Sequence, residues 1–439
     1  MRIAMIGAGY VGLVSGACFA EFGMQVHVID ADPSKITALH EGRIPIYEPG
    51  LDALVADNVR DGRLEFGTSL DAAMAGADAV FLAVGTPSRR GDGHADLTYV
   101  FAAAEQVAKA AKGPIVLVTK STVPVGTGRK IKEIVARVRP DLEISVASNP
   151  EFLREGNAIG DFMRPDRVVV GTEDGPVGER ARELLRRIYR PLFLMETPIV
   201  NTSLETAELT KYAANAFLAM KISFINEIAD LCERVGADVH DVARGVGLDG
   251  RIGRKFLHPG PGYGGSCFPK DTLAVARTAR DYDSPLTLIE TTIAINDARK
   301  GQMADRIIAA CGGSVAGKTI AVLGLAFKPE TDDMRDAPSL VVVPKLVEAG
   351  ATVRAYDPVA MGHAKGMLPE AVVYASGALD AAAGADALVV LTEWNEFRAL
   401  SPEKLKQTMR GTVLEDLRNI YEPGTMREAG FSYRSIGRL

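Results

Sequence analysis

The residue best suited to chemistry is Cys267, which stands between a glycine- and proline-rich segment at 259–266 and the sequence Phe-Pro-Lys-Asp at 268–271. Pro269 suits the first turn of a helix, so Cys267 is predicted to lie at a helix N-terminus. There the positive end of the helix dipole and the ammonium of Lys270 favour the thiolate, the nucleophilic form of cysteine. The glycines indicate that backbone approaches a ligand closely at this point. The alternative, a buried structural thiol, is our interpretation of the three cysteines that lie in apolar helical patterns, Cys18, Cys232 and Cys311.

A second motif, Gly7-Ala8-Gly9-Tyr10-Val11-Gly12, follows a predicted strand and precedes a helical pattern at 13–22. This is the setting of a dinucleotide fingerprint, in which the glycines allow a tight turn, close approach to a pyrophosphate and packing of helix on sheet. The next predicted strand ends at Asp30, whose carboxylate can accept hydrogen bonds from ribose hydroxyls and would repel a 2′-phosphate, so NAD is favoured over NADP. Lys35 faces either the adenosine end of such a site or solvent. The structural alternative is a tight turn with a solvated Asp30.

Short apolar runs alternate with helical patterns near both ends of the chain, which predicts βαβ units and parallel sheets. The expected strands are 3–6, 26–29, 79–84, 115–118 and 144–147, then 319–323, 352–356, 387–391 and 412–415. Between the two sets, a helical pattern runs from about Asn201 to Val235, roughly 50 Å at 1.5 Å per residue, and would join domains or form a dimer core.

We therefore expect an α/β protein with two Rossmann-like, doubly wound parallel-sheet domains joined by a long central helix and a helical middle domain. The expected divisions are an NAD-binding domain at 1–195, a central and dimerisation domain at 196–312, and a second Rossmann-like domain at 313–439. That last domain opens with Gly324-Leu325-Ala326-Phe327-Lys328 and lacks the second and third glycines of the fingerprint, so it is a poor dinucleotide site. Lys328 there can contact a phosphate or a sugar hydroxyl of a second substrate.

Composition limits the class of protein. The 439-residue chain carries 50 Lys and Arg against 56 Asp and Glu, and its net charge of −6 disfavours nucleic acid as a main partner. Its four cysteines show no spacing typical of a zinc site or a disulfide framework, so no metal is expected and a reducing compartment is favoured. No signal-type segment opens the chain and no window approaches the ~20 apolar residues of a membrane span, so we expect a cytoplasmic protein without a membrane partner.

Five segments together resemble the successive motifs of the UDP-glucose 6-dehydrogenases, within the UDP-glucose/GDP-mannose dehydrogenase family. They are the glycine motif, Lys-Ser-Thr-Val-Pro at 120–124, Ser-Asn-Pro-Glu-Phe-Leu-Arg-Glu-Gly at 148–156, Lys-Tyr-Ala-Ala-Asn-Ala-Phe at 211–217 and Gly-Gly-Ser-Cys-Phe-Pro-Lys-Asp at 264–271. The resemblance covers essentially the whole chain. It implies that UDP-glucose, two NAD⁺ and water give UDP-glucuronate and two NADH, with the UDP-sugar bound by the domain at 313–439. It further implies that Cys267 captures a C6 aldehyde as a thiohemiacetal, whose oxidation gives a thioester that water hydrolyses.

The resemblance also implies residue roles. Lys211 would stabilise negative charge on the C6 oxygen, and Asn215, four residues further along the same helix, would hold that oxygen or water. Asp271 would help Lys211 handle the water, and Glu151, with Thr122 beside it, would be the general base of hydrolysis. From the residues alone, Lys211 reads as a solvated helix lysine and Glu151 as a helix N-terminal acid. The implied catalytic set is Cys267, Lys211, Asn215, Asp271, Glu151 and Thr122. The implied cofactor contacts are Gly7, Gly9, Tyr10, Val11, Gly12, Asp30, Lys35, Thr86, Thr122, Glu155, Lys270 and Arg335. The implied substrate contacts are Glu151, Phe152, Leu153, Arg154, Glu155, Lys211, Asn215, Arg251, Phe256, Leu257, His258, Pro259, Gly260, Gly264, Phe327, Lys328 and Arg418.

Arg251 is implied to reach the substrate of a neighbouring subunit, so a homodimer is expected, and the product would feed polysaccharide synthesis. Three alternatives stay open. The same two-step oxidation could act on GDP-mannose or a UDP-N-acetylhexosamine. A single-step hydroxyacid dehydrogenase would need no thiolate, and a catalytically inactive protein would only sense NAD or a nucleotide sugar.

Overall fold

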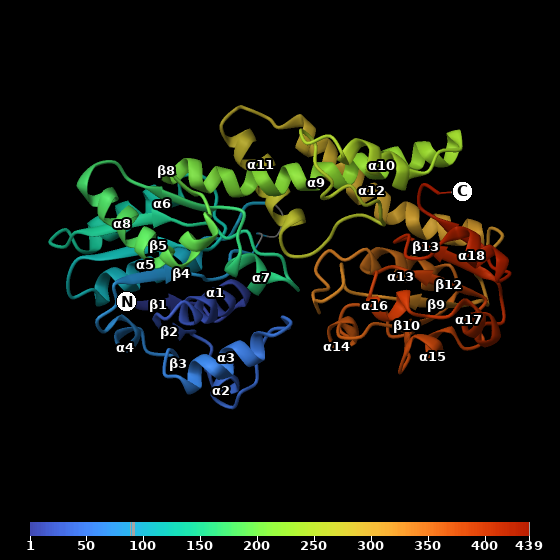
Figure 1. Ribbon diagram of the computed structural model, residues 1–439, viewed down its shortest axis with the longest axis horizontal. Helices are drawn as coiled ribbons and strands as arrows, with labels where there is room; N and C mark the ends of the chain where they lie inside the picture. The colour runs from blue at the N-terminus through green and yellow to red at the C-terminus, as the bar shows by residue number, and fades with distance from the viewer. Residues whose placement is uncertain (88, 90–92, 439) are drawn as a thin grey trace. The chain divides into compact units, whose positions relative to one another are not determined.

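The computed structural model describes residues 1–87, 89 and 93–438. The chain divides into two compact units, Met1–Ala214 with Arg277–Tyr282, and Asn215–Ala276 with Asp283–Leu439 (Figure 1). This division falls inside the long helix α9 (Leu204–Val235), and the three functional divisions expected from the sequence stay a prediction. In the described part of the chain, no helix combines the length and apolar character of a membrane span.

The first unit is built on an eight-stranded sheet with the order β3-β2-β1-β4-β5-β6-β7-β8. Its strands are β1 (Arg2–Ile6), β2 (Gln25–Ile29), β3 (Leu64–Gly67), β4 (Ala79–Leu82), β5 (Ile115–Thr119), β6 (Ile144–Ser148), β7 (Val168–Thr172) and β8 (Ile199–Ser203). The first six strands are parallel and follow the doubly wound order. In this order, β2 and β3 are added on one side of β1, and β4, β5 and β6 are added on the other side, so the order reverses between β1 and β4. The β6–β7 pair is antiparallel, which no feature of the apolar pattern indicated.

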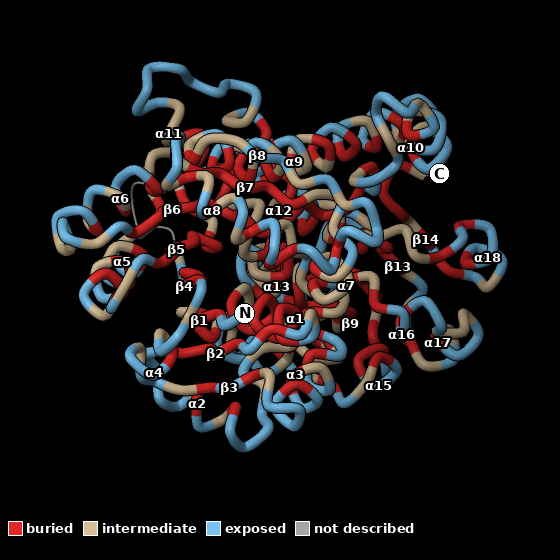
Figure 2. Tube along the Cα trace, turned by 60° about the vertical axis from the view of Figure 1, so that its left-hand side comes forward, coloured by how far each residue is buried: buried red, intermediate tan, exposed pale blue. Residues whose placement is uncertain are grey.

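Helices cover both faces of this sheet. One face packs against α1 (Tyr10–Glu21), α2 (Pro33–His40), α3 (Leu51–Arg60), α7 (Ala158–Met163), α8 (Gly175–Ile188) and the 3₁₀ helix η1 (Arg190–Met195). The other packs against α4 (Leu70–Met74), α5 (Thr98–Ala110) and α6 (Thr127–Val138). Strands β4 and β5 are buried along their whole length (Figure 2). Burial on both faces explains why they read as continuous apolar runs rather than as alternating patterns.

The long helix begins three residues later than its sequence pattern predicts. Asn201, Thr202 and Ser203 belong to strand β8, where they pair with β7. The reason is local, because β8 contains the β-branched residues Ile199, Val200 and Thr202, which favour a strand. The hydroxyl of Ser203 accepts a hydrogen bond from the backbone N–H of Thr206 at 3.2 Å, as an N-cap residue does, so the helix starts immediately after it.

The second unit contains a six-stranded, fully parallel sheet with the order β11-β10-β9-β12-β13-β14. Its strands are β9 (Thr319–Leu323), β10 (Thr352–Tyr356), β11 (Val373–Tyr374), β12 (Ala387–Val390), β13 (Val413–Asp416) and β14 (Ser432–Ser435). One face packs against α9, α10 (Val239–Gly247), α12 (Thr287–Ala310), α13 (Ser339–Glu348) and α14 (Met361–Ala364). The other packs against α15 (Ala378–Ala382), α16 (Asn395–Arg398), α17 (Pro402–Thr408) and α18 (Pro423–Glu428). Together with the first unit, this confirms the predicted fold class.

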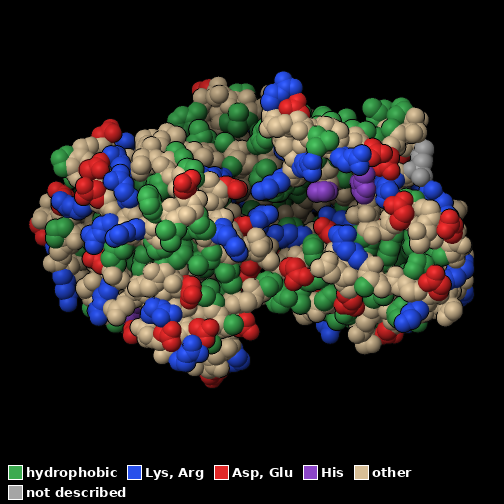
Figure 3. Space-filling model, in the orientation of Figure 1, with side chains coloured by type: hydrophobic (Ala, Val, Ile, Leu, Met, Phe, Trp, Pro, Cys, Tyr) green, Lys and Arg blue, Asp and Glu red, His purple; other side chains and the backbone are tan. Residues whose placement is uncertain are grey.

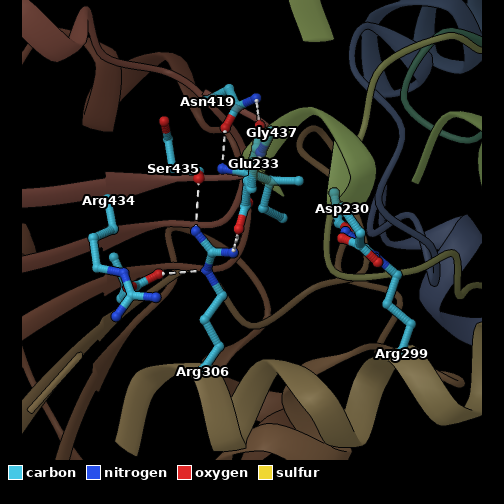
Figure 4. Close-up of polar contacts among 11 residues, drawn as sticks. Asp230, Glu233, Arg299, Arg306, Asn419, Arg434, Ser435 and Gly437 are labelled. Atoms are coloured by element: carbon cyan, nitrogen blue, oxygen red, sulfur yellow. Dashed lines mark hydrogen bonds and ion pairs between the residues drawn. The ribbon is translucent and has the colours of Figure 1, made fainter. Parts of the chain in front are cut away.

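A partly buried charge network joins the C-terminal segment at 435–437 to the helices of this unit (Figure 4). Arg306 of α12 donates to Glu233 of α9 at 2.7 Å, to Glu415 of β13 at 3.0 Å and to the carbonyl of Ser435 at 2.7 Å. Glu233 also accepts from the backbone N–H of Gly437 at 2.8 Å. Burial raises the pKa of Glu415, against the opposing effect of Arg306. The network thereby holds the last strand and this C-terminal segment against α9 and α12.

Candidate active site

The predicted cofactor residues of the first unit gather at the carboxyl ends of its sheet's central strands, whereas Lys270 and Arg335 belong to the second unit. The glycine motif follows β1, Asp30 follows β2, Thr86 follows β4 and Thr122 follows β5. The loops after β4 and β5 are joined, because the Thr86 hydroxyl donates to the carbonyl of Thr122 at 3.0 Å. This edge, beside the β1–β4 reversal, is where open α/β sheets bind their ligands.

The three glycines meet three different environments. A Cβ on Gly7, which has a φ of 111°, would lie 2.6 Å from the carbonyl oxygen of Ala83. A Cβ on Gly12 would lie 1.9 Å from the carbonyl oxygen of Gly7, so the helix can pack here only without a side chain. A Cβ on Gly9 would meet no described heavy atom within 4 Å. Gly9 therefore faces open space at the N-terminus of α1, as required of a backbone cradle for pyrophosphate.

Asp30 lies beside this cradle. One oxygen of its carboxylate accepts from the backbone N–H of Ala8 at 2.8 Å and pairs with the ammonium of Lys35 at 3.2 Å. The other oxygen accepts from the backbone N–H of Asp32 at 2.9 Å. Because an ionised carboxylate offers about four acceptor positions, the second oxygen keeps capacity for a ribose hydroxyl. Tyr10 and Val11 lie in the first turn of α1 and pack partly against the core of the sheet.

The segment after β6 holds a buried ion pair. Glu151 Oε1 lies 3.1 Å from Lys211 Nζ, and the two side chains are 6% and 3% exposed. The Lys211 ammonium also lies 5.3 Å from the centre of the Phe152 ring. The interpretation of Lys211 as a solvated lysine is therefore wrong, because it is buried against a carboxylate and an aromatic ring.

The rest of this segment is fixed by its own contacts. Arg154 makes a bidentate pair with Asp161, and the side chain of Leu153 packs against the core of the sheet. Glu155 lies two residues beyond Leu153 in the same loop. The buried Lys120, from the neighbouring loop, donates to the amide oxygen of Asn149 at 3.0 Å. Burial lowers the pKa of Lys120 to about 8.

Cys267 directly precedes α11 (Phe268–Asp281), and its carbonyl accepts the backbone N–H of Asp271 at 2.8 Å. The cysteine therefore lies at a helix N-terminus, where the sequence placed it. Asp271 is buried and accepts from the side-chain amide of Asn215 and the ammonium of Lys270, each at 2.6 Å. Asn215 of α9 and the start of α11 are thus joined in the second unit. The other three cysteines are buried, and burial raises the pKa of each of their thiols, to about 12 for Cys18.

The loop before Cys267 is held by three buried polar residues that sequence reasoning missed. Asn226 of α9 accepts from the Gly260 N–H at 2.8 Å, and Arg299 of α12 donates to the Gly260 carbonyl at 2.7 Å. Asn296 of α12 bonds both the N–H and the carbonyl of Tyr263. Arg299 is itself paired with Asp230, as Figure 4 shows. Their only signal in the sequence was a polar residue interrupting an apolar helical pattern.

The remaining predicted substrate residues of the second unit lie in two places. Phe256 has a φ of 64°, and the centre of its ring lies 6.0 Å from that of Phe268. Leu257 is buried in the core, whereas His258 is exposed. Pro259 and Gly264 are buried, and a Cβ on Gly264 would lie 2.4 Å from the carbonyl oxygen of Asp336. At the carboxyl ends of β9 and β13, Arg418 donates to the carbonyl of Phe327 at 2.8 Å, and the Lys328 ammonium lies 5.3 Å from the Phe327 ring.

Two predicted arginines are engaged differently. Arg335 pairs with Asp333, and its carbonyl accepts the N–H of Gly265 at 2.7 Å, so it abuts the cysteine loop. The side chain of Arg251 is 89% exposed and pairs with Asp249. Arg251 therefore points into solvent on its own chain.

The second sheet differs from a dinucleotide site at one informative position. Asp357, after β10, stands where Asp30 stands in the first sheet, but it is fully buried. Its carboxylate accepts from the backbone N–H groups of Leu325, Ala326, Val359 and Ala360 and from the indole of Trp394. A carboxylate committed to these five donors cannot bind a ribose.

Comparison with known families decides the assignment. The models of the UDP-glucose/GDP-mannose dehydrogenase family match residues 1–193 as the NAD binding domain, 205–298 as the central domain and 321–423 as the UDP binding domain. The chain belongs to this family. It is an NAD-dependent oxidoreductase, and the open cradle at Gly9 and the Asp30 carboxylate fit the cofactor.

Individual relatives of this dehydrogenase match it along all or nearly all of their length. The UDP-glucose 6-dehydrogenase of Rhizobium meliloti is 61% identical over 438 residues, which cover 100% of both chains. The UDP-glucose dehydrogenase structure from Pyrobaculum islandicum has a TM-score of 0.91 and 39% identity, covering 100% of this chain and 98% of that one. The UDP-D-ManNAc dehydrogenase structure from Pyrococcus horikoshii has a TM-score of 0.85 and 27% identity, covering 100% and 99%.

Proposed function

We propose that this enzyme oxidises UDP-glucose at C6 to UDP-glucuronate through covalent intermediates on Cys267, with two NAD⁺ and one water consumed. Cys267 carries the proposal. It lies at the N-terminus of α11, and it is the one cysteine of the four that is not buried. The choice of sugar is supported by 61% identity to a UDP-glucose 6-dehydrogenase over the whole chain. NAD would bind at residues 1–195 and the UDP-sugar at 313–439, around Phe327, Lys328 and Arg418.

In the first oxidation, the C6 alcohol loses a proton from oxygen, which passes to water, and a hydride from carbon. NAD⁺, when bound, accepts the hydride at this and the later oxidation. The Lys211 ammonium would stabilise the negative charge that develops on the C6 oxygen. Its burial beside Glu151 supports this role, because a charge acts more strongly where water is excluded.

Covalent capture then retains the aldehyde. The Cys267 thiolate adds to C6, and the C6 oxygen takes up a proton to give a thiohemiacetal. Loss of that proton from oxygen and of a second hydride from carbon leaves a thioester. Glu151 would accept a proton from the attacking water, and the C–S bond breaks to release the carboxylate product and the thiolate. Asn215 would hold the C6 oxygen or the water, and Asp271 would help Lys211 handle the water; the hydrogen bond from Asn215 to Asp271 supports a joint action of these two residues on the water.

The test is the number of NADH formed per sugar consumed. We expect two from the parent enzyme and loss of this yield in Cys267→Ser, whereas Cys311→Ser, at a buried thiol, keeps it. A ratio of one in the parent would instead indicate the single-step hydroxyacid reaction. Binding of NAD and nucleotide sugars without turnover would indicate a sensor.

The identity of the sugar requires a separate measurement. Because the chain is similar to a UDP-D-ManNAc dehydrogenase, UDP-N-acetylhexosamines are the second candidate substrates. GDP-mannose is the third. A panel of UDP-glucose, GDP-mannose and UDP-N-acetylhexosamines, scored by NADH yield, should give the highest kcat/KM with UDP-glucose. A higher value for either other class would replace the proposed substrate.

We further propose that the partner of this chain is a second copy of itself. Phe217, Phe224 and Leu231 recur every seven residues on α9 and are 57%, 47% and 53% exposed. Such a stripe is typical of a helix that packs against another helix. Over the first unit, on the left of Figure 3, acidic and basic side chains are interspersed, which does not favour a polyanionic partner for that surface. We place the enzyme in the cytoplasm, supplying UDP-glucuronate for polysaccharide synthesis.

The dimer and the role of Arg251 can be tested together. Phe224→Glu should convert the dimer to a monomer in light scattering. If Arg251 completes the neighbouring site, Arg251→Ala and Cys267→Ser chains are each inactive alone. In an equal mixture about half of the dimers are mixed, and each mixed dimer has one competent site, so about a quarter of parental turnover should return. A mixture that stays inactive, despite demonstrated subunit exchange, would contradict a role for Arg251 across the interface.

A further inference from the structure

Glu48 is a buried carboxylate that neither the motifs nor the proposed reaction uses. It lies in the loop between α2 and α3 and is 6% exposed. Its Oε1 accepts from the backbone N–H of Ala158 at 2.7 Å, and its Oε2 accepts from that of Gly156 at 2.6 Å and from the Tyr10 hydroxyl. A carboxylate that is costly to bury is thus satisfied by three donors from two distant segments.

The first segment is the end of the loop after β6. Ala158 is the first residue of α7, and the preceding Asn157 directs its side-chain amide to Asp161 instead of capping the helix. Glu48 therefore supplies the cap from more than a hundred residues away, at a helix end where negative charge is favourable. The loop that it fixes begins at Glu151 and carries every predicted substrate contact from Glu151 to Glu155.

The second segment is the cofactor cradle. Tyr10 follows Gly9 and opens α1, so its hydroxyl bond ties the first turn of that helix to Glu48. Burial, and then the Glu48 carboxylate, raise the pKa of Tyr10, which keeps its hydroxyl protonated as a donor. One carboxylate thus joins the cradle to the loop that contains Glu151.

We propose that Glu48 is a positioning residue that holds the substrate loop, residues 151–157, in register with the cofactor cradle. The inference rests on the proposed function for its kinetic readout, whereas its structural readout is independent of any activity. In this proposal the Tyr10 hydroxyl helps to position the substrate loop through its hydrogen bond to Glu48, in addition to the predicted contact of Tyr10 with the cofactor.

The principal variant is Glu48→Gln, which removes the charge and keeps the shape. In either orientation of the new amide, an N–H group faces at least one of the two backbone N–H donors. We expect amide hydrogen exchange in peptides spanning 151–160 to become about tenfold faster, and the KM for nucleotide sugar to rise about tenfold. Glu41→Gln, at an exposed carboxylate in the same loop, is the control and should change neither quantity.

A purely structural role for Glu48 would lower the fraction of folded enzyme and leave KM unchanged, which would overturn the proposal. Unchanged exchange at 151–160 would overturn it even if the enzyme proved to use another substrate. If Glu48→Gln fails to fold, Tyr10→Phe provides the test, because it removes one donor and leaves the two backbone bonds. Tyr10→Phe should still accelerate exchange at 151–160 and raise the KM for nucleotide sugar, and an effect confined to the KM for NAD would overturn the proposed linkage.

Discussion

The buried pair of Lys211 and Glu151 makes a quantitative prediction about Lys211→Met. Methionine keeps much of the apolar stem of lysine but leaves the Glu151 carboxylate without its ammonium, 3.1 Å away in the parent. Removing one partner of a buried ion pair costs about 3–5 kcal/mol, because the remaining charge stays desolvated. We expect the free energy of unfolding, measured by urea denaturation, to fall by that amount. Lys109→Met, at an exposed lysine paired with Glu105, should cost less than about 1 kcal/mol.

A double variant separates the charge effect from lost packing. Lys211→Met with Glu151→Gln removes both charges of this pair and should recover at least half of the lost stability, since residue 151 is then no longer a buried carboxylate that lacks the Lys211 ammonium. In the same variants, turnover should fall about a hundredfold or more for Lys211→Met, whereas NAD affinity, measured by fluorescence titration, should change less than about threefold. Equal losses in turnover and NAD affinity would refute the proposed role of Lys211. A double variant no more stable than Lys211→Met would refute the electrostatic argument.

Two further predictions concern the first unit. Gly9→Ala should fold like the parent and weaken NAD binding about tenfold or more, measured by titration, because its methyl group enters only the open cradle. Gly12→Ala should instead lower the free energy of unfolding by about 3 kcal/mol, because its methyl group meets backbone. Equal effects of the two variants on NAD binding and on stability would contradict the assigned roles. Burial lowers the pKa of Lys120 from 10.5 to about 8, so folding favours its neutral form and stability is lost as pH falls from 10.5 toward 8. Relative to Lys120→Met, the parent should gain about 2 kcal/mol in urea unfolding between pH 7.5 and 9.5, and a difference independent of pH would contradict this.

The sequence predicted the local features well. The apolar runs of β1, β2, β4, β5 and β6 reflect burial on both faces of the sheet, which leaves a signal in each segment. The position of Cys267 at the start of α11 followed from a proline and from glycines beside it. Features of this kind depend on neighbours within a few residues, so a single sequence can reveal them.

The features that escaped prediction depend on distant partners. Residues 201–203 form a strand because β7 lies beside them, and a helical period gives no warning of that pairing. The role of Glu48 has no local signal, since its donors are supplied by Tyr10 and by residues 156–158, which lie far from it in the sequence. Asn226, Asn296 and Arg299 looked like polar interruptions of helices until the loop that they hold was in place. Tertiary contacts decided each of these cases.

The contrast among the four thiols has a practical consequence for measuring this enzyme. At neutral pH a thiolate-directed alkylating reagent should consume one thiol per folded chain, because burial disfavours the reactive form of Cys18, Cys232 and Cys311. The amount of label bound would then count competent chains in any preparation. Turnover could be expressed per working site, and a slow variant could be told apart from a partly inactivated one without reference to protein concentration.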